Sequence, residues 1–403
     1  MSNTPNLSHG RHMLSIPGPS IMPDRVLQAM HRAAPNIYTG ELIEITESCI
    51  PDLKAVAKTA GDVAMYIGNG HAAWEASLAN TLALGDTVLV PGGAQFSQGW
   101  AQCARQRGLE VQLLDFGRSA AIDPQAVEDA LRADTDGKIK AVLVVQVDTS
   151  SSAKSDLPAI RAAMDAAGHG ALLMSDSIAC LGCDDMQMDA WGVDVVITGS
   201  QKGLMVPPGM AFVFYSEKAK QARHALERVS LYWDWHPRSY PEGYYQYSCG
   251  TAPTHHFYGL RVALDMIVHE EGLDNVLARH ATLARAVWAA CDAWGAGGPL
   301  AMNIKDEAAR SNAVTSIAIG KPDGTRLRTW LTEQAGATLG IGLGMSSDED
   351  PGADGFFRIG HMGHLNSHML MGTLGVIDAG LKALDIPHGD GALAAAASVC
   401  AGR

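Results

Sequence analysis

The segment Gly199-Ser200-Gln201-Lys202 contains the first residue that could do covalent chemistry. It follows Val193–Thr198, a β-rich run that predicts a buried strand. Lysine is seldom buried unless it is paired. Buried at a strand end, Lys202 would have a lowered pKa, and its neutral amine could attack a carbonyl group to form a Schiff base. Taken alone, Lys202 fits a surface lysine at a turn better.

Asp176 favours the interpretation of Lys202 as a Schiff-base lysine, because it ends the preceding predicted strand, Ala171–Ser175. Ligands of α/β sheets bind at the carboxyl ends of the strands. Pyridoxal 5′-phosphate (PLP) needs an anionic group there that keeps its pyridine nitrogen protonated, so that the ring can accept electrons. An isolated Asp at this place would be a turn or N-cap residue. An Asp and a Lys at successive strand ends therefore indicate PLP more strongly than either residue alone.

Two further motifs suit the same ligand. Gly68-Asn69-Gly70-His71 precedes a predicted helix, and free N–H groups at a helix start bind anions such as a phosphate. Because Ala73 stands where a third glycine would be, this is no G-x-G-x-x-G motif, and alone it indicates only a tight turn. Arg358 lies in the apolar run Phe357–Ile359, where its guanidinium needs a partner. That partner is a substrate carboxylate or a structural salt bridge.

These residues are positioned by strands that alternate with helices between Gly61 and Ser216. The alternation predicts an α/β fold with a mostly parallel sheet and right-handed crossovers. The predicted strands are 86–91, 141–147, 171–174, 193–198 and 211–215, and the predicted helices are 72–84, 98–107, 124–132 and 157–167.

The alternation of predicted strands and helices ends after Tyr215. The aromatic segment Leu231–Tyr247 is either a loop packed on a partner or an ordinary surface excursion, and a helix is predicted over Tyr258–His269. A smaller α+β domain with strands at 313–319 and 356–359 follows. We expect an N-terminal arm (1–16), a large domain (17–274) and a small C-terminal domain (275–403).

Composition excludes several classes of protein. The chain has 403 residues and a net charge of -13, which argues against binding to nucleic acid or to an anionic membrane. Met1–His12 lacks the apolar core of a signal peptide, and no apolar run is long enough to span a bilayer, so a cytoplasmic location is expected. Cys180 and Cys183 form one C-x-x-C without a second pair at zinc spacing, so we predict no metal site.

Together these motifs give the chain a resemblance to the class V (fold type I) PLP-dependent aminotransferases, in the alanine–glyoxylate and serine–glyoxylate (serine–pyruvate) branch. The resemblance runs from about Pro17 to Gly363. It rests on Gly199–Lys202 with Pro207-Pro208-Gly209, on Gly68–His71, on Asp176-Ser177 and on Arg358-Ile359-Gly360. It implies a mostly parallel seven-stranded sheet flanked by helices, and a smaller C-terminal α+β domain.

The resemblance also implies roles for individual residues. Lys202 and Asp176 are the implied catalytic residues: Lys202 binds PLP and moves the proton between the substrate Cα and the cofactor, and Asp176 pairs with the pyridine nitrogen. Phe96 and Ile178 enclose the ring. The other implied cofactor contacts are Asn69, Gly70, His71, Ser150, Gln201, Tyr247 and Thr251, and the implied substrate contacts are Gly18, Ser150 and Arg358.

Thr251 is implied to reach the cofactor phosphate of a neighbouring subunit, which would make the protein a homodimer with active sites at the interface. The chain departs from the usual family pattern in three places. Ser151-Ser152 replaces a Thr-Gly, Ser248 stands where a Tyr is usual, with Tyr247 beside it, and Tyr38–Leu42 replaces His-Arg-Ser-Pro.

The implied reaction is transamination between a small amino acid, serine or alanine, and a small 2-oxo acid, with glyoxylate as the expected acceptor. Relatives that use aspartate, ureidoglycine or pyridoxamine as donor are alternatives. A PLP-dependent lyase or desulfurase is another. Such enzymes place His before the lysine, where this chain has Gln201, and Cys249 is the candidate for a desulfurase thiol. A catalytically silent module is the last alternative, and the intact Lys202, Asp176 and Arg358 argue against it.

Overall fold

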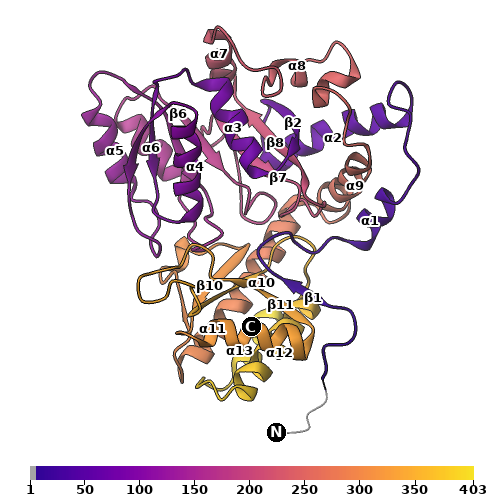
Figure 1. The fold of residues 1–403 in the computed structure, drawn as a ribbon, viewed down its shortest axis with the longest axis vertical. Coiled ribbons are helices and arrows are strands. Elements are labelled where there is room, and N and C mark those ends of the chain that lie inside the picture. The colour runs from indigo at the N-terminus through magenta and orange to yellow at the C-terminus, as the bar shows by residue number, and fades with distance from the viewer. Residues whose placement is uncertain (1–5) are drawn as a thin grey trace.

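The structure is a computed structural model that describes residues 6–403, so residues 1–5 of the predicted N-terminal arm lie outside it. Its strands form two sheets, the larger in the indigo-to-magenta upper part of Figure 1 and the smaller in the orange and yellow lower part. Within residues 6–403, no helix combines the length and the apolar character that crossing a bilayer requires.

The larger sheet has seven strands in the order β2-β8-β7-β6-β5-β3-β4. Their bounds are β2 Asp62–Gly68, β3 Thr87–Pro91, β4 Glu110–Leu114, β5 Ile139–Val145, β6 Leu172–Asp176, β7 Val195–Gly199 and β8 Gly209–Tyr215. All neighbours are parallel except β8, which runs antiparallel to β2 and to β7. The predicted mostly parallel sheet of seven strands is therefore confirmed.

Helices lie before, between and after these strands along the chain. Their bounds are α1 Asp24–Met30, α2 Glu41–Ala57, α3 Gly70–Thr81, α4 Gln95–Gln106, α5 Pro124–Ala133, α6 Leu157–Ala166, α7 Glu217–Ala225, α8 His236–Ser239 and α9 Thr254–Leu264. The predicted helix over Tyr258–His269 begins earlier than expected, at Thr254, and its end is a π turn, Asp265–Glu270.

Strand β5 shows why the sequence of the sheet interior lacks polar alternation. Val142 and Val144 pack into the apolar core on one face of the sheet, and Leu143 and Val145 pack into the core on the other face. A strand covered on both faces needs apolar residues at every position. The continuous apolar run thus results from the position of the sheet between two layers of helices.

The smaller sheet has the order β1-β11-β12-β10-β9. Its strands are β1 Met13–Ser15, β9 Ala301–Met302, β10 Val314–Ala318, β11 Ala337–Ile341 and β12 Phe356–Gly360, and its helices are α10 Leu273–Gly295, α11 Asp323–Trp330, α12 Ser367–Ala383 and α13 Ala392–Cys400. Strand β1 pairs parallel with β11, so part of the predicted N-terminal arm extends this sheet. The predicted domain boundaries stay a prediction.

The aromatic segment Leu231–Tyr247 packs largely against its own chain. The Trp235 ring stacks on Tyr215 with the centroids 4.2 Å apart, and Arg238 is buried and donates a hydrogen bond to the Met65 carbonyl at 2.8 Å. The interpretation as an ordinary surface excursion is therefore wrong for these residues. Leu231 and Tyr245 remain exposed, and a contact of the segment with a partner stays a prediction.

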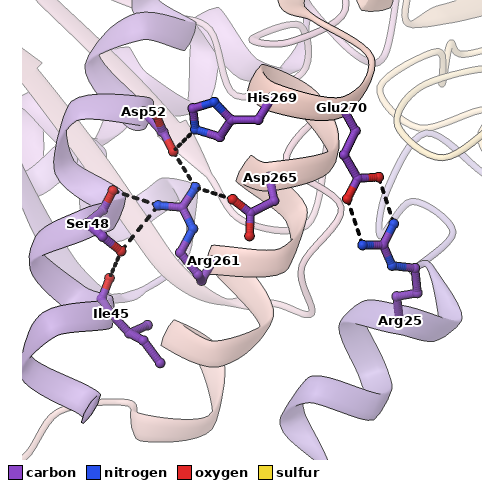
Figure 2. Close-up of polar contacts among 8 residues, drawn as sticks. All are labelled: Arg25, Ile45, Ser48, Asp52, Arg261, Asp265, His269 and Glu270. Atoms are coloured by element: carbon purple, nitrogen blue, oxygen red, sulfur yellow. Dashed lines mark hydrogen bonds and ion pairs between the residues drawn. The ribbon is translucent and has the colours of Figure 1, made fainter. Parts of the chain in front are cut away.

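Helices α2 and α9 are joined by an ion-pair network around Arg261 (Figure 2). The Arg261 guanidinium donates to the Asp52 carboxylate, to Asp265 at 3.0 Å and to the Ser48 carbonyl at 2.6 Å. His269 bonds the same Asp52 oxygen at 2.8 Å. Asp52, Asp265 and His269 lie close enough to share a metal ion, but the guanidinium already supplies the positive charge among them.

We expect Arg261→Ala to lower the free energy of unfolding by about 2 kcal/mol, because it leaves the buried Asp52 carboxylate without its cation. The control is Arg25→Ala. Arg25 pairs with Glu270 at 2.7 Å, but both side chains are exposed, so its loss should leave the urea midpoint almost unchanged. Equal shifts of the midpoint in the two variants, measured by urea denaturation, would contradict the assignment of stability to the Arg261 network.

Candidate active site

A cavity of about 250 Å³ lies at the carboxyl ends of the strands of the larger sheet. Its lining residues follow β2, β3, β5, β6 and β7, as expected for a ligand site of a parallel sheet. They are Asn69, Gly70, His71, Trp74, Phe96, Val147, Thr149, Asp176, Ile178, Ala179, Gln201 and Lys202. Segments distant in the sequence thus bring most of the predicted cofactor residues into one space, which we call the active-site cavity.

Lys202 lies in the turn after β7, and its amine donates a hydrogen bond to the Pro17 carbonyl at 2.5 Å. Gly18 has φ +109°, and a Cβ there would lie 2.2 Å from the amine, so only glycine leaves the lysine its space. Burial, and to a smaller extent the charge of Arg358, lower the pKa of Lys202 to about 8, while Asp176 opposes the shift. The amine can therefore lose its proton near neutral pH and act as a nucleophile.

Asp176 is the last residue of β6 and is 2% exposed. Its carboxylate accepts hydrogen bonds from the Ile178 amide at 2.9 Å and from the Trp74 indole at 2.7 Å. Burial raises the pKa of Asp176 to about 7, and the two hydrogen bonds and Lys202 counter that effect. A cation against this carboxylate would stabilise its charged form.

Trp74 was not predicted as a site residue. It stands in α3, one helical turn after Gly70, and that spacing places it over the same cavity as the helix start. The spacing was the only signal in the sequence, and it does not by itself reveal the contact with β6.

The start of α3 forms one end of the cavity, and helix starts suit anions. Asn69 is the N-cap and accepts a hydrogen bond from the His71 amide at 3.1 Å. A Cβ at Gly70 would lie 2.3 Å from the Ile178 side chain, so the close approach of this turn requires glycine. Across the cavity, the buried Gln201 Oε1 has no hydrogen-bond partner among residues 6–403.

The side walls of the cavity are apolar. Phe96, at the start of α4, and Ile178, after β6, both line it, and the Phe96 ring lies edge-on to Trp74 with the centroids 6.4 Å apart. A flat aromatic ligand fits between such walls. With an amine, a buried carboxylate and a helix start at its ends, the cavity fits the functional groups of PLP.

Arg358 lies in β12 of the smaller sheet and is 6% exposed. Its guanidinium donates to the Ile341 carbonyl at 2.7 Å and to the Thr149 carbonyl at 2.9 Å. In the described part of the chain, no carboxylate lies within 4.0 Å of it, so a structural salt bridge has no partner there. Burial lowers the pKa of Arg358 to about 10, which still leaves it charged at neutral pH.

Five predicted site residues do not line the active-site cavity of residues 6–403: the substrate contacts Gly18 and Arg358, and Ser150, Tyr247 and Thr251. Ser150 is fully buried, and its hydroxyl donates to the Asp148 carboxylate, while its neighbour Thr149 lines the cavity. The Tyr247 hydroxyl faces Glu47 at 3.5 Å, and Thr251 is exposed. The predicted contact of Tyr247 with the cofactor, and that of Thr251 with the cofactor of a neighbouring subunit, stay predictions.

Known proteins with similar sequences and structures match this chain over most of its length. Residues 68–366 match the family model described as aminotransferase class-V. The chain is 36% identical to the serine–glyoxylate aminotransferase of Methylorubrum extorquens, covering 96% of this chain and 95% of that protein. It is 32% identical to the L-aspartate–glyoxylate aminotransferase of Paracoccus denitrificans, covering 92% and 91%. The crystal structure of the ureidoglycine–glyoxylate aminotransferase from Bacillus subtilis superposes with a TM-score of 0.84 at 27% identity, covering 98% and 99%.

We expect Trp74→Phe to weaken PLP binding by the apoprotein about tenfold, because Asp176 loses a charge-assisted hydrogen bond. The matched control is Trp100→Phe. Trp100 is equally buried and stacks on Trp74, but its indole N–H has no partner among the described residues. Titration of the apoproteins with PLP, followed by absorbance, measures both affinities. An equal loss in the two variants would mean that ring volume matters and the hydrogen bond does not.

Proposed function

The chain belongs to the class V aminotransferases, and we propose that it transfers the amino group of serine or alanine to glyoxylate, using PLP bound at Lys202. The observation that supports this most directly is that a partly buried amine and a buried carboxylate share one cavity, at the ends of neighbouring strands. The relatives named for glyoxylate support the choice of acceptor.

When bound, PLP supplies an electron sink for the negative charge that develops at the substrate Cα. The chain supplies the rest of the chemistry. In the proposal, Asp176 keeps the pyridine nitrogen protonated, and Phe96 and Ile178 hold the ring between them. Lys202, once its amine is free, removes and returns the proton at the substrate Cα. Asn69, Gly70, His71 and Gln201 bind the phosphate.

The substrate side rests on Arg358, which binds the carboxylate that amino donor and oxo acid share. The donor gives up its amino group in the first half-reaction, and glyoxylate leaves as glycine in the second. One buried carboxylate, Asp148, lies near this end of the site. A second carboxylate on the donor would be repelled by it, which favours serine or alanine over aspartate.

The proposal includes a homodimer in the cytoplasm, in which Tyr247 and Thr251 contact the cofactor of the neighbouring subunit. Thr251 and the apolar side chains of Tyr38, Leu231 and Tyr245 are exposed, which supports an interface that includes them.

We expect serine and alanine to exceed aspartate at least tenfold in kcat/KM as amino donors to glyoxylate, a difference of about 1.4 kcal/mol in transition-state free energy. Glycine formation from the three donors measures this ranking.

We expect Lys202→Ala to lower kcat about 10³-fold, the size of a general acid–base contribution. The exposed Lys138→Ala is the control and should keep wild-type rates. Wild-type transamination by Lys202→Ala, or no transfer from any donor, would refute the proposed function.

We also expect capture of PLP by the apoprotein to accelerate as pH rises through about 8. Lys202 has a lowered pKa near this value, and only its neutral amine is nucleophilic. Because the positive charge of Arg358 contributes to lowering this pKa, Arg358→Gln should move the midpoint to higher pH. Stopped-flow absorbance between about pH 6 and about pH 10 measures the midpoint of the pH dependence of PLP capture. A midpoint near that of an ordinary lysine, or one unmoved by Arg358→Gln, would contradict this assignment.

A further inference from the structure

Asp148 is a buried carboxylate for which the proposed mechanism has no chemical step. It lies beyond the end of β5 and is 5% exposed. It accepts hydrogen bonds from the Ser150 amide at 2.9 Å, from the Ser150 hydroxyl, and from the Phe96 amide at 2.8 Å. One side chain thus joins the turn after β5 to the start of α4.

The contact with α4 replaces an ordinary helix cap. The N-cap position of α4 is Ala94, whose side chain cannot accept a hydrogen bond. The first two amides of the helix instead reach the Ser150 hydroxyl, at 3.3 Å from Gln95, and the Asp148 carboxylate, from Phe96. Such N–H groups have no partner within a helix, and a negative charge there is stabilising. Asp148 therefore fixes the backbone of the residue whose ring forms one wall of the active-site cavity.

The same carboxylate also fixes the residue that holds Arg358. Thr149 lies between Asp148 and Ser150, and the hydrogen bonds between those two close the turn around it. The Thr149 carbonyl accepts from the Arg358 guanidinium at 2.9 Å. The negative charge of Asp148 also stabilises the charged form of this arginine.

We propose that Asp148 is a positioning residue that aligns the two ends of the active site. It holds Phe96 at the wall for the cofactor ring and, through Thr149, holds Arg358 for the substrate carboxylate. This inference rests on the proposed function, because both ends matter only if PLP and a carboxylate substrate bind there.

The hydrogen bonds also limit what Ser150 can do. Its hydroxyl proton is donated to Asp148, so its oxygen can only accept a further hydrogen bond. A carboxylate also only accepts, so Ser150 cannot bind the substrate carboxylate in this arrangement, and that task falls to Arg358.

The test is Asp148→Asn, which keeps the size of the side chain but turns one acceptor into a donor. We expect KM for the amino donor and for glyoxylate to rise about tenfold each, because Arg358 serves both, while kcat changes less than about threefold. The visible circular dichroism of bound PLP should change as well, because Phe96 loses its anchor. That second readout does not require turnover.

Three further variants sharpen the result. Asp123→Asn makes the same substitution at the N-cap of α5, outside the active-site cavity, where the Asn oxygen can still accept from the Gln125 amide, 3.0 Å from Asp123; KM and the dichroism should keep their wild-type values. Ser150→Ala removes the hydroxyl bond but keeps the bonds from Asp148 to the Ser150 and Phe96 amides, so its rise in KM should be smaller than that of Asp148→Asn. Asp148→Glu keeps the charge, and its rise in KM should be smaller than that of Asp148→Asn.

An Asp148→Asn protein with wild-type KM for both substrates and unchanged dichroism would overturn the proposal. So would a loss of kcat at constant KM, or failure of both Asp148 variants to fold, since Asp148 would then be needed for folding rather than for alignment. Failure of the proposed function looks different: the wild-type protein would transfer no amino group, while the dichroism of bound PLP would still report on Phe96.

Discussion

The structure depends on keeping two opposite charges, Lys202 and Asp176, in a space from which most water is excluded. Desolvation disfavours the charged form of each, so burial lowers the pKa of the lysine and raises that of the aspartate. Each group reduces the shift of the other. Both are therefore tolerated because both are present, and removal of one would leave the other as an uncompensated buried group.

The sheet and the N-terminal segment together fix the distance between these charges. Strands β6 and β7 are parallel neighbours in which Asp176 pairs with Ile197, so the turn with Lys202 extends just past the aspartate. From the other side, the Ser20 hydroxyl donates to the Lys202 carbonyl at 2.7 Å, and the Ser20 amide donates to the Gln201 carbonyl at 2.8 Å. The turn thus has little freedom, and the lysine amine is aimed by contacts that the strand alone could not supply.

This division explains what could be predicted from the sequence. The alternation of strands and helices, and the places of Asp176 and Lys202 at strand ends, follow from local periodicity and turn residues, which predict an α/β fold with a mostly parallel sheet. The number of seven strands comes from the family resemblance. The roles of Trp74 and Asp148 could not be predicted, because their hydrogen-bond partners lie far away in the sequence. Trp74 in α3 donates to a residue of β6, and Asp148, in the turn after β5, accepts from an amide of α4. A single sequence contains no record of such contacts, since each residue also fits its own segment without them. The packing of Leu231–Tyr247 on its own chain could not be predicted for the same reason.

Arg358 shows how the second sheet enters the site. It lies opposite Gly340 in β11, where a Cβ would come within 3.1 Å of the arginine Cβ, so a glycine there gives the long side chain room to leave the sheet. The guanidinium is then held by one carbonyl from the smaller sheet, Ile341, and by one from the larger domain, Thr149. Because neutral carbonyls hold it, its charge stays available for a carboxylate. Any displacement of one sheet against the other would stretch one of these two bonds, so the grip on a substrate carboxylate depends directly on how the two sheets sit together.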